Sequence, residues 1–326
     1  MVPPMANSIH IEIIFWNQKG GAMQSHYHSL NDDLRARFGQ RVVKLSLNAY
    51  LGCPHRDPVT GEGGCTFCGE GSGHFAGTGP SLWEQLSHQK ALLSHKWPHA
   101  AYIAYFQAYT NTYAPVEILR ALYDQALAFP GVVGLAIATR PDCLGPEVLD
   151  LLSQYQKKTF LWVELGFQTS RQDTALRIRR GYPNAVYDQA ALALQQRHIP
   201  LVTHLIFGLP GETPEDMLAS VDYVCARPIW GIKLQLLHVL RHTALGKQYE
   251  QAPFPLLSQE EYIRLLTLAL PRIPWEVVIH RLTGDGPKQD LIGPAWSKNK
   301  KAVLNALHQT FLEKKIRQGS AVPVKH

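Results

Sequence analysis

Short apolar runs alternate with longer amphipathic stretches along most of this chain. From residue 41 onward, six apolar runs have the length and composition of β-strands: residues 41–48, 101–107, 132–138, 160–167, 201–207 and 231–238. Amphipathic stretches of helical length lie between them, several with proline in the first turn: residues 115–128, 146–157, 170–180, 184–197 and 214–226. Because a strand, a helix and the next parallel strand form a right-handed βαβ unit, this order predicts a parallel sheet.

Several of these strands are apolar at consecutive positions, which is typical of strands covered on both faces. Six successive βα units indicate an α/β fold, specifically a partial (β/α)6 barrel of the TIM type that spans residues 23–240. Chemistry in such folds lies at the carboxyl ends of the strands. We therefore expect the functional residues to converge on one mouth of the barrel.

The regular alternation of predicted strands and helices ends after the sixth strand. Ser258 and Glu261 have capping-box spacing at the start of a helix predicted over residues 258–270. A short strand is predicted over 276–280, and a last helix from about Ser297. We expect residues 241–326 to be a C-terminal α/β extension that partly closes the mouth of the barrel.

Residues 1–22 contain one isolated apolar run, bounded by Pro3-Pro4 and Gly20-Gly21. They include no cysteine and no strand that a six-unit barrel requires. We expect this N-terminal extension to be dispensable, with Met23 opening the barrel segment. The alternative is that residues 9–16, rich in β-branched and aromatic residues, add a strand or cover an apolar patch.

The composition is that of a globular protein. Of 326 residues, 45% are hydrophobic and 18% charged, which excludes a disordered or fibrous chain. No apolar run reaches the roughly 18 residues that a membrane-spanning helix needs, so we expect no membrane partner and a cytoplasmic location. The formal charge of +6 favours anionic partners such as nucleic acid or phosphorylated substrates.

Three of the five cysteines lie close together directly after the first predicted strand: Cys53, Cys65 and Cys68. In a reducing compartment, such clustering indicates a metal site and not a disulfide framework. Three thiolates fit a [4Fe-4S] cluster with one open iron, because such clusters normally take four cysteines. From spacing alone, structural zinc with His55 or His74 as the fourth ligand is the alternative.

A three-cysteine loop after the first strand of a partial βα barrel resembles the radical S-adenosylmethionine (SAM) superfamily, which commonly has an aromatic residue, here Phe67, inside the last C-x2-C. Further phrases between about Ser29 and Leu307 resemble the bacterial YhcC/YtqA-type group: KLSLN, GGCTFC, AYFQAYTNTYAP, ATRPDC, VELGFQT, RRG, THLIFGLPGET, GIKLQLLHVL and HRLTGDGP. The radical SAM domain of that group is similar to the catalytic subunit of Elongator.

The resemblance implies that Cys53, Cys65 and Cys68 ligate a [4Fe-4S] cluster whose fourth iron binds SAM. Reductive cleavage of SAM then yields a 5′-deoxyadenosyl radical, with an electron from a donor such as flavodoxin or ferredoxin. The Elongator-like branch, together with the positive charge, favours the wobble uridine of tRNA as substrate. Because no RNA-binding module is evident, a small metabolite or a peptide is an alternative. A zinc-binding interaction protein is the alternative outside the enzymes.

The resemblance also implies residues that contact the amino group of SAM. The superfamily has a Gly-Gly-Glu type motif after its second strand, and this chain has TNTYAP there instead. Gln107, Thr110 and Asn111 are therefore the candidates for that contact.

Other SAM contacts are implied at the fourth and fifth strands. Glu164 and Gln168 lie four residues apart and share a face of a regular strand, where they resemble positions that bind the ribose. Arg180, in the phrase RRG, is the candidate for a bidentate pair with the SAM carboxylate. Gly208, in the phrase GLPGET, allows a close backbone approach to adenine or phosphate.

Three further residues are candidates for substrate chemistry: His238, Arg281 and Asp285. Alternation along the sixth strand predicts that Lys233 and His238 lie on opposite faces, so that only one of them points to the mouth. Arg281 and Asp285 lie in a polar, glycine-rich phrase that predicts a loop at the mouth, where the alternative is that they pair with each other. Tyr105 is interpreted as a packing residue.

Overall fold

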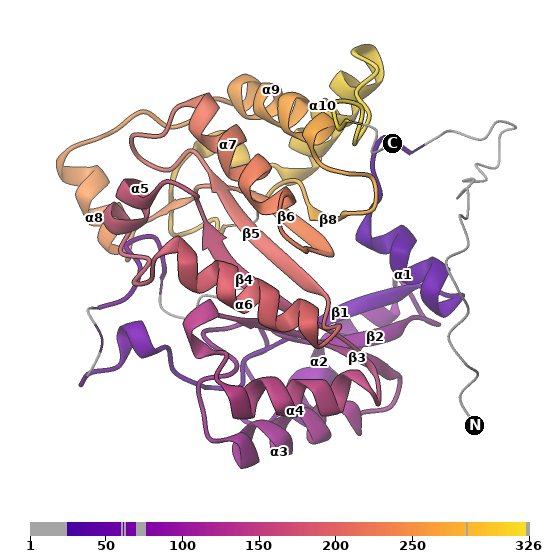
Figure 1. Cartoon of the computed structure of the whole chain (residues 1–326). Helices are drawn as coiled ribbons and strands as arrows, with labels where there is room; N and C mark the ends of the chain where they lie inside the picture. The colour runs from indigo at the N-terminus through magenta and orange to yellow at the C-terminus, as the bar shows by residue number, and fades with distance from the viewer. Residues whose placement is uncertain (1–24, 60, 62, 70–75, 285, 324–326) are drawn as a thin grey trace, which may run out of the picture.

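The computed structural model describes residues 25–59, 61, 63–69, 76–284 and 286–323. Over these residues, the centre is a curled sheet of seven parallel strands in the order β1-β2-β3-β4-β5-β6-β8 (Figure 1). The strands are β1 (Val42–Leu47), β2 (Ala101–Phe106), β3 (Val132–Thr139), β4 (Phe160–Gln168), β5 (Leu201–Phe207), β6 (Gly231–Leu236) and β8 (Val278–Arg281). All six strands predicted for the barrel are present, and the partial barrel of the TIM type is confirmed.

The strand predicted at 276–280 belongs to this same sheet as its seventh member. It is β8, and it pairs with β6 so that Lys233 lies opposite Arg281. Its four residues follow two helices and a long connection, so its sequence pattern alone does not show that it continues the βα series. The chain beyond residue 240 therefore contributes the seventh strand of the sheet.

Segments from both ends of the described chain meet at β8. The backbone N–H of Ile279 donates to the carbonyl of His28 at 2.8 Å. The side chain of Gln318 accepts from the backbone N–H of His28 at 2.9 Å and donates to the carbonyl of Val277 at 2.7 Å. Gln318 thus links the N-terminal segment to the edge strand of the sheet.

Helices cover the outer face of the sheet, and α9 and α10 continue this layer beyond α7 (Figure 1). The helices are α1 (Leu30–Phe38), α2 (Leu82–Ser94), α3 (Val116–Leu127), α4 (Pro146–Gln156), α5 (Gln172–Arg177), α6 (Asn184–Gln196), α7 (Pro214–Cys225), α8 (Ala244–Gln251), α9 (Gln259–Ala269) and α10 (Lys300–Glu313). The predicted capping box of α9 is present, since Ser258 Oγ accepts from the backbone N–H of Glu261 at 3.1 Å.

The helix predicted over residues 170–180 is much shorter than expected. Only Gln172–Arg177 form α5. Arg179 and Gly181 then have positive φ angles of 51° and 83°, which no helix accommodates, and Pro183 precedes α6. The chain therefore turns here, between the end of β4 and α6.

Side chains on the strands alternate between an outer core and an inner one. Fully buried leucine and phenylalanine side chains pack beneath the helices on the outer face, among them Leu45, Phe106, Leu135, Leu165 and Leu234. The inner face carries apolar side chains near the amino ends of the strands: Ile103, Ala136, Trp162 and Val202. Two residues further along, the inner face is polar: Tyr105, Glu164 and His204. The interior thus has an apolar base and a polar layer above it.

A second, two-stranded sheet lies beside the mouth. It pairs β7 (Val239–Leu240) with β9 (Leu291–Gly293) in antiparallel fashion. The backbone N–H of Leu245, in α8, donates to the carbonyl of Thr66 at 2.8 Å. This segment therefore contacts the loop that carries Cys65 and Cys68.

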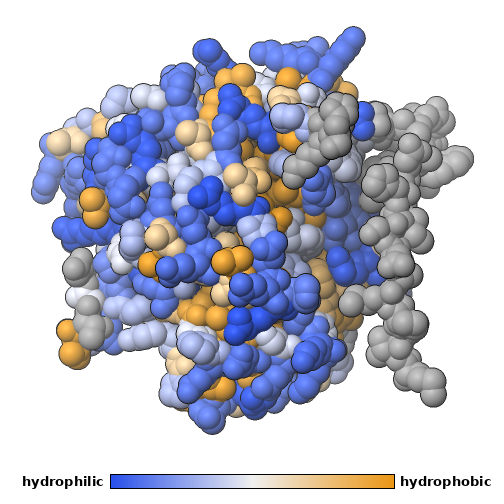
Figure 2. All heavy atoms as spheres, viewed as in Figure 1, coloured by the Kyte–Doolittle hydropathy of each residue, from blue (hydrophilic) through white to orange (hydrophobic). Residues whose placement is uncertain are grey.

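Hydrophilic residues predominate on the face seen in Figure 2, and apolar residues show between them in small groups. Within the described ranges, no helix is both long and apolar enough to cross a membrane. Residues 1–22 lie outside the described part of the chain, so their dispensability stays a prediction.

Candidate active site

A cavity of about 530 Å³ opens at the carboxyl ends of the strands. Its walls come from the cysteine loop, from the ends of the barrel strands and from the segment around β7 and β9. Cations outnumber carboxylates among the described lining residues: Arg56, Arg140, Arg180, Lys233 and Arg281 against Glu164 and Asp290. This excess of positive charge favours anionic ligands.

Cys53, Cys65 and Cys68 all line this cavity. The guanidinium of Arg56 fixes their loop, because it donates to the carbonyl of Cys68 at 2.5 Å. It also packs against Gly64, where a side chain would collide with it and where φ is +83°. These two contacts of Arg56 therefore hold the C-x2-C segment of the loop against the end of the sheet.

The surroundings of the cysteine loop favour a thiolate at Cys65 and disfavour one at Cys68, whose pKa is raised well above its usual range by its hydrogen bond with Cys65 and by burial. The hydrogen bond from Cys68 lowers the pKa of Cys65, burial opposes it, and the charges of Arg140 and Arg56 lower it further. Thiolates are the ligands of iron–sulfur clusters, so three cysteines on one cavity wall beside two guanidinium groups fit a [4Fe-4S] cluster. Among the described residues, no three His, Cys, Asp or Glu side chains are placed to hold a single metal ion, so the fit of the cluster rests on the donor chemistry of the three cysteines and on their shared cavity wall.

Of the two histidines weighed as zinc ligands, only His55 lies within the described residues. His74 lies outside the described residues. His55 is buried, its ring packs against Gly181, and its Nε2 has no hydrogen-bond partner within the described ranges. His55 is also absent from the described residues that line the cavity.

Glu164 is the centre of a buried polar cluster in the inner layer. Its Oε2 accepts from the Tyr105 hydroxyl at 2.7 Å, contacts His204 Nε2 at 2.9 Å and pairs with the ammonium of Lys233. Its Oε1 accepts from Trp162 Nε1 at 2.9 Å. Four strands, β2, β4, β5 and β6, thus contribute to one fully buried carboxylate.

Charges in this cluster determine its protonation. Burial raises the pKa of Glu164, but the charges of Lys233 and Lys44 outweigh it and hold the pKa well below its usual range. Burial and the charge of Lys233 lower the pKa of His204 to about 4. At neutral pH the cluster therefore combines a carboxylate with a neutral imidazole that can donate its Nε2 proton.

The sequence analysis missed Tyr105, His204 and Lys233 as members of the site. The prediction that Lys233 and His238 lie on opposite faces is wrong as regards the mouth, since both line the cavity. β6 ends at Leu236, and alternation ends with it. The interpretation of Tyr105 as a packing residue holds for its ring, which is buried in the inner core, but its hydroxyl also binds Glu164. The sequence does contain a signal for these residues. Each of the three lies two positions beyond an inner-face residue of its strand, and therefore on the same face of the sheet.

Two of the three candidates for the SAM amino group line the cavity, namely Gln107 and Thr110. Asn111 does not. It is fully buried, and its Nδ2 donates to the carbonyls of Phe106 at 3.0 Å and Ala138 at 2.9 Å. Asn111 therefore joins the ends of β2 and β3. This gives it a positioning role in place of the expected direct contact with the amino group of SAM.

Glu164 and Gln168 both line the cavity, but the strand between them is irregular. Pairing shifts between Gly166 and Gln168, the φ of Gln168 is 66°, and its amide turns back over Gly166. Gly208 is not among the described lining residues. With a φ of +88° it forms the turn after β5 and faces Leu257, and its approach to a ligand stays a prediction that is compatible with this turn.

The expected bidentate contact from Arg180 is not available, because protein atoms already occupy its guanidinium. Its Nε donates to the Tyr182 carbonyl at 3.0 Å, and its Nη1 to the carbonyls of Phe167 at 3.0 Å and Thr169 at 2.8 Å. Its Nη2 donates to Asn184 Oδ1 at 2.7 Å. A guanidinium has five N–H donors, so only one remains. Arg180 thus fixes the end of β4 to the turn before α6.

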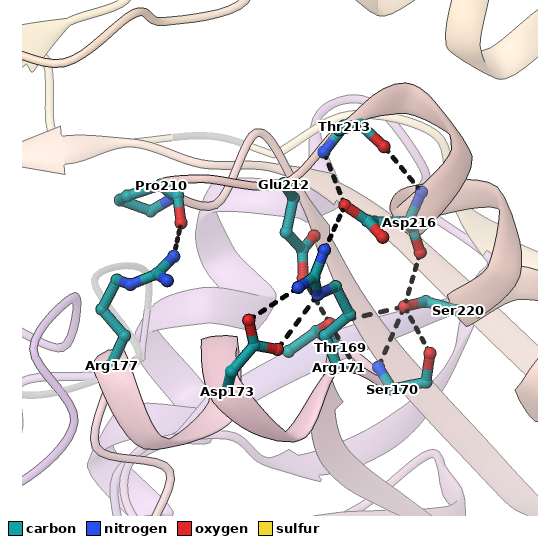
Figure 3. Close-up of polar contacts among 10 residues, drawn as sticks. All are labelled: Thr169, Ser170, Arg171, Asp173, Arg177, Pro210, Glu212, Thr213, Asp216 and Ser220. Atoms are coloured by element: carbon teal, nitrogen blue, oxygen red, sulfur yellow. Dashed lines mark hydrogen bonds and ion pairs between the residues drawn. The ribbon is translucent and has the colours of Figure 1, made fainter.

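Two loops at the rim, after β4 and after β5, are joined by polar contacts (Figure 3). Arg171 Nη1 pairs with Asp216 in α7 at 2.8 Å. The hydroxyl of Thr169 donates to the carboxylate of Glu212. These contacts hold the phrase GLPGET against the end of β4.

Glu212 makes this connection sensitive to pH. Burial raises its pKa from 4.5 to about 7. Such a group stabilises the fold fully below pH 4.5, and the contribution is lost as pH rises through about 7. We expect Glu212→Gln to remove this dependence, so that the free energy of unfolding of the unmodified protein, relative to the variant, falls by about 2–3 kcal/mol between pH 5 and pH 8.

Denaturant unfolding of both proteins across that pH range measures the difference. Glu215→Gln is the matched control, since Glu215 is an exposed carboxylate in the first turn of the same helix. Parallel pH profiles for the unmodified protein and Glu212→Gln contradict the prediction.

The candidates for substrate chemistry are placed as follows. His238 and Arg281 both line the cavity. The ring of His238 packs against Gly284 and Gly286. Asp285 lies outside the described residues, so its role and its pairing with Arg281 stay predictions.

Two family descriptions match this chain. The radical SAM superfamily matches residues 47–224, and the radical SAM C-terminal domain matches residues 229–313. YtqA of Bacillus subtilis is 43% identical over 298 residues, which cover 91% of this chain and 92% of YtqA. YhcC of Escherichia coli K12 is 36% identical over 304 residues, which cover 92% of this chain and 96% of YhcC.

Two further comparisons concern Elongator-like proteins and tRNA. The tRNA uridine(34) acetyltransferase of Dehalococcoides mccartyi is 27% identical over 158 residues, which cover 48% of this chain and 34% of that protein. The structure of archaeal Elp3 from Methanocaldococcus infernus, with an N-terminal deletion, has a TM-score of 0.64 at 15% identity, and the match covers 85% of this chain and 64% of that one. At that identity, the likeness shows the fold alone.

Proposed function

This chain belongs to the radical SAM superfamily and is an enzyme, and on that premise we propose that it modifies the wobble uridine of tRNA. The observation that carries this proposal is the sequence match to a tRNA uridine(34) acetyltransferase. The net charge of +6 and the cationic lining of the cavity support it, because RNA is a polyanion. Family membership replaces the alternative of a zinc-binding interaction protein.

We assign the cluster implied by the family to Cys53, Cys65 and Cys68. When bound there, a reduced [4Fe-4S] cluster supplies the electron that splits SAM into methionine and a 5′-deoxyadenosyl radical. Arg56 and Arg140 lie beside the thiolates and stabilise their negative charge. A small one-electron donor protein, such as a flavodoxin or ferredoxin, is the partner we propose for reduction.

The chain's own residues bind and shield the reactants. Gln107 and Thr110 present polar side chains at the end of β2, close to the cysteine loop in the same cavity. Glu164 fixes the hydroxyl of Tyr105 in the inner layer at 2.7 Å. The segment around β7 and β9 covers part of the mouth and so limits the access of water, which protects reactive intermediates.

The proposal predicts a change in tRNA. We expect tRNA from cells without this gene to lack a modified wobble uridine that cells with the gene contain, as measured by mass spectrometry of digested tRNA. That tRNA should also raise 5′-deoxyadenosine formation several-fold when added to cluster-loaded protein, SAM and reductant, because it is the unmodified substrate.

The control is tRNA from cells that carry the gene, which should stimulate much less because its wobble uridine is already modified. A gene encoding Cys65→Ala should fail to restore the modification. Identical nucleosides in both strains, together with no stimulation by either tRNA, would contradict the tRNA substrate and favour a metabolite or a peptide.

A further inference from the structure

We propose that the cavity wall formed by β6 and β8 is an anion-binding site, centred on Arg281, that takes a phosphate group of the substrate. The inference deepens the proposed function and rests on it, because a nucleotide in RNA brings phosphate to the cavity. The same chemistry also fits a free phosphorylated metabolite.

Arg281 is available to a ligand. It is the last residue of β8, lies next to Lys233 of β6 in the sheet, and lines the cavity with it. Among the described residues, no hydrogen bond or ion pair to its guanidinium is present, in contrast to Arg180 with four. A half-buried guanidinium without acceptors is costly, and an oxyanion supplies them.

The surrounding charges leave this region positive. Glu164 is paired with Lys233, and its oxygens also accept from neutral groups. Lys44 of β1 lies over the ring of Tyr105, with its Nζ 4.7 Å from the ring centroid, and forms no ion pair with a described carboxylate. Lys44 and Arg281 therefore add two positive charges that form no ion pair with a described carboxylate, although Glu164 acts on Lys44 at longer range.

The excess of positive charge affects the pKa of Lys233. Burial lowers its pKa, Glu164 opposes this, and the charges of Lys44 and Arg281 lower the pKa further. A bound anion would remove that repulsion. The other carboxylate in the lining, Asp290, lies 3.5 Å from His242 at the mouth and does not neutralise this wall.

Phosphate fits this arrangement better than a neutral group does. A guanidinium fork binds two phosphate oxygens at once, while an ammonium nearby acts as a point charge. Burial also lowers the pKa of His204 and of His280, so both imidazoles are neutral and the positive charge comes from the lysines and Arg281. The wall therefore combines one directional donor with a positive field.

Binding of uridine 5′-monophosphate, inorganic phosphate and uridine to cluster-loaded protein with SAM tests the site. We expect Arg281→Gln to weaken binding of the two phosphate probes by at least tenfold, because a charged hydrogen-bond donor is lost. Uridine, which lacks the phosphate, should bind both proteins alike. Arg281→Lys should bind the monophosphate with intermediate affinity, because it keeps the charge and loses the fork.

The matched control is Arg120→Gln, since Arg120 lies on the outer helix α3 and donates to Gln154 at 3.0 Å. Iron content and the melting temperature verify that each variant folds and keeps its cluster. Equal affinity of Arg281→Gln and the unmodified protein for the monophosphate overturns the site. So does failure of the unmodified protein to bind either phosphate probe.

The tRNA assay separates this inference from the proposed function. In one outcome, binding of the monophosphate requires Arg281 but tRNA does not stimulate SAM cleavage. The anion site then stands, with a free phosphorylated metabolite as its ligand, and the tRNA proposal fails. If tRNA stimulates the unmodified protein and Arg281→Gln equally, the tRNA proposal stands and the anion site is overturned.

Discussion

Replacing any one of Cys53, Cys65 and Cys68 with alanine is expected to remove the cluster and reduce SAM cleavage to background. In a four-iron cluster, three thiolates leave one iron open for SAM. The loss of one cysteine leaves a second iron without a protein ligand, and two thiolates are too few to hold the cluster. The three line one cavity, and Arg56 and Arg140 lie beside Cys65. Iron and acid-labile sulfide content, together with 5′-deoxyadenosine formation under anaerobic conditions, measure the effect.

Two other cysteines serve as matched controls. Cys143 and Cys225 are absent from the described residues that line the cavity, and burial raises the pKa of each thiol to about 12. Cys143→Ala and Cys225→Ala should therefore keep the full iron content. Retention of all iron in Cys65→Ala would refute the assignment of the cluster.

Glu164→Gln is expected to destabilise the fold by about 3–5 kcal/mol, as removing one partner of a buried ion pair does. The substitution leaves the ammonium of Lys233 buried without a carboxylate, and it weakens the acceptor of Tyr105 and His204. Denaturant unfolding of the variant and the unmodified protein at pH 7 measures the loss.

A double-mutant cycle shows whether the pair is responsible. Removing both charges, in Glu164→Gln with Lys233→Met, should cost less than the sum of the single changes by about 2 kcal/mol. The exposed pair of Arg241 and Glu250, 3.1 Å apart, is the control, and Glu250→Gln should cost less than about 1 kcal/mol. Additive losses at Glu164 and Lys233 would show that the carboxylate is not coupled to the ammonium.

The alternation of apolar and polar positions predicts most of this fold because each of the first six strands has its own helix. It does not show where β8 belongs. β8 has four residues, and its partner β6 lies more than forty residues earlier, across α8 and α9. Strand pairing over such a separation depends on the assembled sheet and leaves no local pattern in the sequence.

The candidate site shows the same limit. The cysteine loop could be predicted because its ligands lie close in sequence. Lys233 could not be paired with Glu164 from sequence, since β5 lies between their strands and only the curvature of the sheet brings the side chains together. Arg180 was misassigned because nearby carbonyls occupy its donors, and sequence spacing does not show which acceptors a buried guanidinium finds.

The bonds of Gln318 at β8 also have a consequence for the timing of synthesis. His28 and Gln318 are 290 residues apart in the chain, and their contact forms only after residue 318 has been translated. At about 5–20 residues per second, the ribosome needs on the order of 15–60 s for that stretch. The cysteine loop is translated early in this interval, before β7, α8 and β9. Its three cysteines therefore leave the ribosome well before the segments that face them across the cavity.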